Sequence, residues 1–114
     1  MELEYLFIYG VFREASGPIL GDYIFCDRAF IFGGLWKVND FYPGFKRNPF
    51  IGKVWGDIVL VDPSIFEKLD DFEGNEYRRA KIWTSIGIES WIYEWKGSVS
   101  DYELITSGDW IVRK

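Results

Sequence analysis

Three carboxylates, Asp70, Asp71 and Glu73, fall within four residues and precede Gly74. Asp70 and Glu73 are three residues apart, so a helix places both on one face. Like charge, together with burial beside Phe72, would raise the pKa of one of these carboxyl groups. A carboxyl group tuned in this way can transfer protons near neutral pH. The alternative is a solvated acidic helix end, and these residues alone leave both interpretations open.

The composition favours one small domain with an aromatic interior. A length of 114 residues fits a single domain over residues 1–114. The six Trp, seven Tyr and ten Phe favour strands around a wide, aromatic-lined interior. The net charge of −5 argues against binding a nucleic-acid backbone or an anionic membrane. A small nucleic-acid-binding barrel with aromatic platforms would fit the aromatic residues but conflicts with this charge.

Several kinds of chemistry are excluded by residue type. The chain contains no histidine and one cysteine, Cys26, so a Cys–His nucleophile pair, a histidine metal site and an internal disulfide are impossible. We interpret Cys26 as a small strand residue. Residues 1–4 are acidic where a signal peptide is basic, and no apolar run approaches the ~20 residues of a membrane span. We therefore expect a cytoplasmic protein.

The first half of the chain predicts strands joined by glycine-containing turns. Residues 5–9 are continuously apolar and predict a strand that is buried on both faces and central to its sheet. Residues 11–18 predict a loop, and residues 19–23 predict one helical turn. Residues 24–38 predict strand segments interrupted at Gly33-Gly34 by a bulge, a bend or a close backbone approach.

One helix is expected in the second half. Residues 51–61 predict a long strand, after which Asp62 is placed as N-cap and Pro63 at the first helical position. Gly74 is placed as the helix stop. The apolar stripe of this helix is predicted to contain Ile65, Phe66, Leu69 and Phe72.

The remaining residues predict a hairpin and a closing segment. Residues 79–85 and 89–95 alternate in polarity around a turn, and residues 102–106 predict a short extension. Asp109 and Trp110 are interpreted as structural closure of the C-terminal part. The fold class is therefore α+β, with a small, mixed, bent β-barrel and a flanking helix.

Four motifs occur together in a family-specific order along nearly the whole chain. They are Phe7-Ile8-Tyr9-Gly10-Val11-Phe12-Arg13, Tyr42-Pro43-Gly44, Leu69-Asp70-Asp71-Phe72-Glu73-Gly74 with Tyr77-Arg78-Arg79, and Ser107-Gly108-Asp109-Trp110. This arrangement resembles the gamma-glutamylcyclotransferase superfamily, in particular its AIG2-like branch, which includes gamma-glutamylamine cyclotransferases. The resemblance implies a small mixed β-barrel with helices at its flank.

The resemblance also implies a reaction. Family members release 5-oxoproline when the α-amine of a gamma-glutamyl compound attacks its own γ-carbonyl group, as an acyltransferase or lyase of this type does. Glu73 matches the family's catalytic glutamate and would act first as general base and then as general acid. The implied partner is a small gamma-glutamyl substrate, with no cofactor, metal, nucleic acid or membrane.

A substrate-binding set follows from the same resemblance. The loop Tyr9-Gly10-Val11-Phe12 would offer backbone N–H groups to the substrate. An ordinary strand-to-loop turn would have the same sequence pattern. The two tyrosines of the set could line the pocket or simply pack. Arg78 and Arg79 are expected to pair with the clustered acids rather than to touch the substrate. The set consists of Tyr9, Gly10, Val11, Phe12, Tyr77 and Tyr93.

This sequence also departs from the family pattern. Family members have Tyr-Gly-Thr or Tyr-Gly-Ser followed by Leu, whereas Val11 and Phe12 follow Tyr9 and Gly10 here. The change removes a hydroxyl group, which matters if that side chain touches the substrate. A binding module that keeps the pocket without turnover is therefore the alternative hypothesis.

Overall fold

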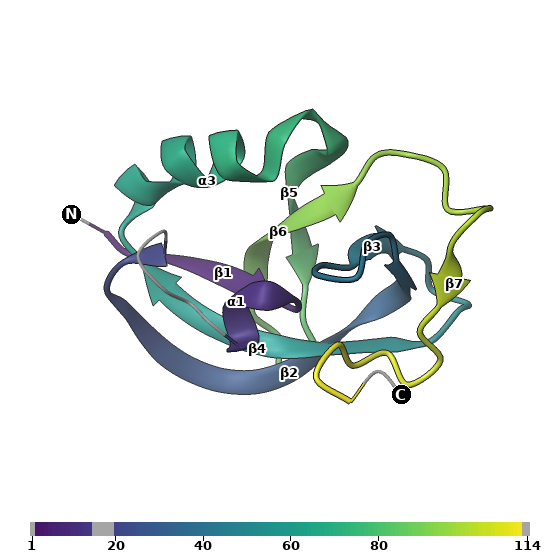
Figure 1. Cartoon of the computed structure of the whole chain (residues 1–114). Helices are drawn as coiled ribbons and strands as arrows, with labels where there is room; N and C mark the ends of the chain where they lie inside the picture. Colours follow the sequence, from purple (N-terminus) through teal and green to yellow (C-terminus); the bar gives the residue numbers. More distant parts are fainter. Residues whose placement is uncertain (1, 15–19, 113–114) are drawn as a thin grey trace.

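The computed structural model describes residues 2–14 and 20–112, which form a mixed sheet curled into a half-barrel (Figure 1). The strand order is β3-β2-β4-β1-β6-β5, with β7 paired to β2. This architecture confirms the predicted α+β class with a bent mixed sheet. The strands are β1 (Glu4–Ile8), β2 (Tyr23–Lys37), β3 (Gly44–Arg47), β4 (Lys53–Val61), β5 (Tyr77–Trp83), β6 (Glu89–Trp95) and β7 (Glu103–Leu104).

Strand β1 lies at the centre of the sheet, as its apolar run predicts. It pairs antiparallel with β4 and parallel with β6, where Leu6 lies opposite Trp91. Its side chains alternate between two buried clusters: Phe7 joins one, and Leu6 and Ile8 join the other. Apolar side chains cover both faces of β1, so the position of its carboxyl end is fixed by packing on both sides.

Strand β2 is one long strand that changes partner along its length. Its residues as far as Phe32 pair with β4, and from Gly33 onwards it pairs with β3. A Cβ atom on Gly33 would lie 2.4 Å from the Lys46 carbonyl oxygen, so the glycine allows a close backbone approach. The register shift in this strand instead falls between Phe25 and Asp27, around the free Cys26.

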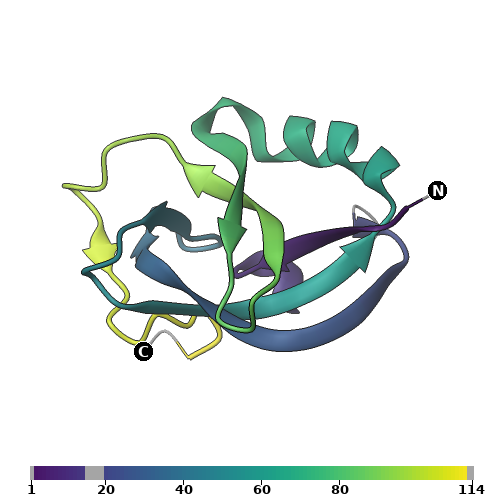
Figure 2. The same ribbon diagram turned by 180° about the vertical axis from the view of Figure 1, so that it is seen from behind.

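The main helix begins as the sequence predicts. Asp62 caps a 3₁₀ turn, η1 (Pro63–Ile65), by accepting a hydrogen bond from the Ser64 backbone N–H at 2.9 Å. The chain continues as α3 (Phe66–Glu73), which ends at Gly74 with a φ of 74°. A second 3₁₀ turn, η2 (Gly74–Glu76), then leads into β5. Both views show α3 along one flank of the half-barrel (Figure 1, Figure 2).

Four local predictions need correction. Val11–Glu14 forms a helical turn, α1, rather than a loop, because the Arg13 N–H donates to the Gly10 carbonyl oxygen. Tyr23 is the first residue of β2 instead of the end of a helical turn, and the rest of that turn falls partly outside the described residues. Strand β4 begins at Lys53. The buried stripe of α3 does not include Phe72, which is 51% exposed.

The other predicted features are confirmed. The β5–β6 hairpin forms, and β7 falls within the predicted short extension. Asp109 and Trp110 are buried, as expected for a closing segment. Within the described ranges, no helix is long and apolar enough to cross a lipid bilayer.

Gly56 in β4 gives a test of this packing. A Cβ atom there would lie 2.4 Å from the Ile8 carbonyl oxygen and 2.5 Å from the Phe7 ring. We expect Gly56→Ala to lower the free energy of unfolding by about 1–3 kcal/mol, because β1 and β4 must move apart. Urea denaturation measures this change, with Glu89→Ala at an exposed strand position as control. An unchanged stability in Gly56→Ala would contradict the packing described.

Candidate active site

A cavity of about 520 Å³ opens where β1 ends. Its walls come from the end of β1, helix α1, the loop before β3 and the end of α3, together with β5 and β6. Aromatic and aliphatic side chains make up most of the lining, so the cavity is a poor solvent for charge. The lining residues are Leu6, Phe7, Ile8, Tyr9, Gly10, Phe12, Phe41, Tyr42, Pro43, Phe72, Glu73, Gly74, Glu76, Tyr77 and Tyr93.

Glu73 is the last residue of α3, and it lines this cavity. Among the residues that the structure describes, no ion pair or side-chain hydrogen bond partners its carboxyl group. Burial raises the pKa of Glu73 from its ordinary value of 4.5 to about 7. The group therefore exchanges its proton near neutral pH. The sequence suggested two causes for a raised pKa, burial and the like charge of neighbouring aspartates. Burial is the cause that raises the pKa of Glu73.

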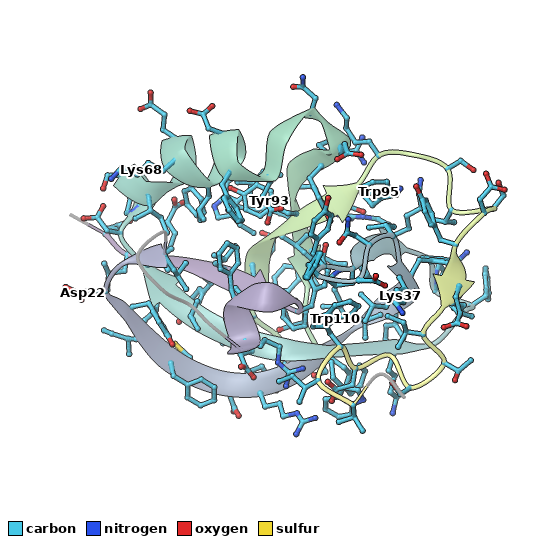
Figure 3. All side chains as sticks on the ribbon, viewed as in Figure 1. Asp22, Lys37, Lys68, Tyr93, Trp95 and Trp110 are labelled. Atoms are coloured by element: carbon cyan, nitrogen blue, oxygen red, sulfur yellow. The ribbon has the colours of Figure 1, made fainter. Side chains whose placement is uncertain are left out.

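Three tyrosines surround Glu73, and their hydroxyl groups already donate elsewhere. Tyr9 donates to the Tyr93 carbonyl oxygen, and Tyr77 donates to the Pro43 carbonyl oxygen at 2.7 Å. Tyr93, which lies beneath α3 in Figure 3, donates to Asp70 at 2.7 Å. Because each hydroxyl has one proton to give, these oxygens can offer only acceptor lone pairs to a ligand. With Glu73, they make the cavity rich in acceptors.

The same tyrosines stay protonated. Burial is the largest cause that raises the pKa of Tyr9, Tyr77 and Tyr93, and the charge of Glu73 contributes in all three cases. Glu73 and these three tyrosines line the same cavity. The tyrosines therefore act as neutral polar walls and leave Glu73 as the residue suited to proton transfer at this point of the cavity.

Asp70 shares the α3 face with Glu73 but lies outside the cavity lining. It pairs with Arg79 through two contacts, at 3.0 Å from Nε and 3.2 Å from Nη2, and it accepts the Tyr93 hydroxyl proton. Arg78 lies 3.7 Å from Glu94. Arg79 thus pairs with one of the clustered acids as predicted, whereas Arg78 contacts Glu94 of β6 instead. Asp70 thus fixes the Tyr93 ring, while Glu73 faces the open volume.

The first loop reaches the cavity through Gly10 and Phe12, which both line it. A Cβ atom on Gly10 would lie 2.8 Å from Pro43 Cδ, so this position needs a glycine. Val11 is the first residue of α1, and N–H groups at the start of a helix precede its regular hydrogen bonds, although the Arg13 N–H already donates to the Gly10 carbonyl oxygen. That these groups hold a substrate stays a prediction.

Helix α1 is anchored by Arg13, a residue that sequence reasoning missed. Its Nη1 lies 2.8 Å from Asp109 Oδ1, and its Nε lies 3.5 Å from Asp57 Oδ2. The Arg13 side chain is 5% exposed and that of Asp109 is 7% exposed. Asp109 also pairs with Arg28 at 2.8 Å. A buried ion pair therefore joins the cavity wall to the C-terminal segment, 96 residues away along the chain.

Sequence reasoning also missed the mouth of the cavity. Tyr42 and Pro43 belong to a sequence motif that was not assigned to the site, and Phe41, Phe72 and Glu76 were not assigned either. The available signal was the dense aromatic loop before β3. Tyr9, Gly10, Phe12, Glu73, Tyr77 and Tyr93 all line this cavity, and the side chain of Val11 lies outside the described part of the chain.

The sequence of this chain matches a known family over nearly its whole length. Residues 6–112 match the family described as gamma-glutamyl cyclotransferase, AIG2-like. The chain belongs to this family. Among curated proteins, no sequence matches this AIG2-like chain.

Solved structures share the AIG2-like fold. YkqA from Bacillus subtilis aligns with a TM-score of 0.78 and 23% identity, over 96% of this chain and 40% of YkqA. This AIG2-like chain thus spans less than half the length of YkqA. The protein ytfP from Escherichia coli aligns with a TM-score of 0.76 and 29% identity, over 96% of this chain and 97% of ytfP. An AIG2-like protein from Mus musculus aligns with a TM-score of 0.74 and 16% identity, over 90% of this chain and 83% of the mouse protein.

The raised pKa of Glu73 predicts a pH-dependent stability difference. Between about pH 4.5 and 7 the folded protein binds the Glu73 proton more tightly than the unfolded chain, so this group's contribution to stability falls as pH rises. We therefore expect Glu73→Gln to gain stability over the wild type at pH 8 relative to pH 5.5. A pKa difference of one between the folded and unfolded states corresponds to about 1.4 kcal/mol, so the gain should reach a few kcal/mol. Urea denaturation at both pH values measures it.

Glu67→Gln controls for the loss of one negative charge, because Glu67 is exposed on the same helix and does not line the cavity. An equal gain in both variants would show that general charge repulsion, rather than burial of Glu73, is responsible.

The anchoring of α1 predicts unequal effects at two arginines that share one carboxylate. Arg13→Met should lower the free energy of unfolding by about 3 kcal/mol, because it breaks a buried ion pair. Arg28→Met should cost less than about 1 kcal/mol, because the Arg28 side chain is 54% exposed. Thermal or urea denaturation of both variants compares them. Equal losses would argue against a special role for the Arg13 contact.

Proposed function

We propose that this protein is a gamma-glutamyl(amine) cyclotransferase-like enzyme that releases 5-oxoproline from a gamma-glutamyl compound. The observation that carries the proposal is the unpartnered Glu73 carboxyl group in an apolar cavity of the described structure, with a pKa raised by burial to about 7. A group of this kind can take up and give back a proton within one turnover at neutral pH. Membership of the AIG2-like family supports the same reaction class.

The proposed reaction uses the substrate's own nucleophile. Glu73 accepts a proton from the α-ammonium group, and the free amine attacks the γ-carbonyl carbon to close a five-membered ring. The C–N bond to the second amine then breaks as Glu73 returns the proton to the leaving nitrogen. The ring nitrogen gives up its remaining extra proton to solvent, from which the freed amine takes up a proton. The products are 5-oxoproline and a free amine. No group of the protein forms a covalent bond with the substrate.

Three further features of the cavity support this chemistry. Its acceptors, Glu73 and the oxygens of Tyr9 and Tyr77, suit an ammonium group before proton transfer. Its concave apolar walls favour a curled glutamyl chain, and holding reacting atoms in such a geometry can lower the barrier by several kcal/mol. The N–H groups of the α1 first turn are proposed to receive the substrate's α-carboxylate or the developing oxyanion.

A turnover assay tests the proposal. Gamma-glutamyl amines should yield 5-oxoproline, with kcat/KM rising through an apparent pKa near 7 because the base must be ionised. Glu73→Gln should lower kcat by at least about 100-fold, since general acid–base catalysis contributes about that much. Glu67→Gln serves as the matched control on the same helix.

Two results would contradict the proposal. Equal turnover by Glu73→Gln would remove Glu73 from the mechanism. Tight binding of 5-oxoproline or gamma-glutamyl ligands, with no product from any amine tested, would instead select the binding module that Val11 and Phe12 suggest.

A further inference from the structure

Helix α1 carries a cavity-lining residue and an ion-pairing residue side by side. Phe12 lines the cavity, whereas the next residue, Arg13, is not among the lining residues and contacts Asp109 at 2.8 Å. The helix has only four residues, Val11–Glu14, and a single helical turn is not stable through its own hydrogen bonds. The position of Phe12 therefore depends on the contacts that hold Arg13.

The carboxylate that holds Arg13 is itself fixed from several sides. Asp109 Oδ1 accepts hydrogen bonds from Arg13 Nη1 at 2.8 Å and from the Ile111 backbone N–H at 3.0 Å. Its Oδ2 accepts from Arg28 Nη2 at 2.8 Å, and its backbone N–H donates to Ser107 Oγ at 3.2 Å. A buried carboxylate bound in this way has one orientation, so it gives the Arg13 side chain one position.

On its cavity side, α1 meets the end of α3 through an aromatic contact. The Phe12 and Phe72 rings pack with their centroids 5.8 Å apart, and Phe72 directly precedes Glu73 in the sequence. All three residues line the cavity. The two rings come from separate elements, so they cover the surroundings of Glu73 together only while α1 stays beside α3.

We propose that Arg13 and Asp109 are positioning residues for the proton transfer, because their ion pair holds Phe12 against Phe72 and so keeps water away from the Glu73 carboxyl group. The inference rests on the proposed function and adds two residues that do not touch the substrate. Neither lines the cavity, so their effect reaches Glu73 through Phe12.

Loss of this aromatic cover has a defined consequence for Glu73. Burial raises its pKa to about 7, so contact with water returns the pKa towards its ordinary value of 4.5. Nearby, Asp70 and Arg79 pair with each other. The other titratable groups that line the cavity are Tyr9, Tyr42, Tyr77, Tyr93 and Glu76. A substitution at Arg13 leaves all of these groups in place.

An NMR titration of the Glu73 side-chain carboxyl carbon tests the inference without a substrate. The wild type should titrate with a midpoint near pH 7, and Arg13→Met should lower the midpoint by about one pH unit or more, a tenfold loss of proton affinity. Removing a cation without admitting water would instead raise the pKa, so the sign of the shift separates the two effects. Arg28→Met removes the same charge from the same Asp109 at an exposed position and should not lower the midpoint.

A second variant tests the aromatic cover with the ion pair intact, and it decides the question if Arg13→Met does not fold. Phe12→Leu keeps an apolar side chain but loses the ring contact with Phe72, so it should also lower the Glu73 midpoint. Phe50→Leu is the matched control, because Phe50 is 93% exposed and does not line the cavity. An unchanged midpoint in Phe12→Leu would overturn the inference.

Turnover of a gamma-glutamyl amine distinguishes this inference from the proposed function. In Arg13→Met the acid limb of the kcat/KM profile should move to lower pH by the same amount as the NMR midpoint, and kcat should fall more than KM changes. A midpoint that stays or rises in Arg13→Met overturns the inference and leaves the cyclotransferase proposal standing. If the wild type gives no 5-oxoproline, that proposal fails, while the NMR midpoints still decide whether the ion pair shields Glu73.

Discussion

An acidic side chain removed from water without a cationic partner is the constraint on which the site depends. Neutralising Glu73 by an arginine would hold its pKa low and end its use as a proton carrier at neutral pH. In the described part of the structure, no arginine pairs with Glu73. Arg79 forms an ion pair with Asp70, and Arg13 forms one with Asp109. The hydroxyl groups of Tyr9, Tyr77 and Tyr93 likewise donate to other groups of the protein. The raised pKa of Glu73 therefore depends on the neighbouring side chains forming their hydrogen bonds and ion pairs with other groups.

The half-barrel makes this arrangement possible because it gathers distant segments around the end of one strand. Strand β1 is covered on both faces and leads directly to Tyr9 and Gly10. Helix α3 ends at Gly74, whose left-handed backbone turns the chain just after Glu73 and lets β5 start beside the cavity. A closed barrel would leave less room for side chains and ligand at this edge, and a flat sheet would leave Glu73 in solvent.

Sequence reasoning succeeded where the signal is local. The apolar run of β1, the Asp62 cap and the Gly74 stop each act through neighbouring residues, so their positions were predicted correctly. The family motifs added Glu73 and Tyr77, and these two line one cavity together with Tyr93. Periodicity assigned Phe72 to the core, but the helix ends one residue later and its last turn projects over the opening. The Arg13–Asp109 contact has no local signature, because each residue alone looks like an ordinary surface charge.

The Arg13–Asp109 ion pair also orders events during synthesis. Arg13 is translated early, whereas its carboxylate partner follows 96 residues later. During translation, Arg13 therefore lacks its ion-pair partner Asp109 until the Ser107–Trp110 segment emerges from the ribosome. This contact between the cavity wall and the C-terminal segment can therefore form only after residues 107–110 have left the exit tunnel.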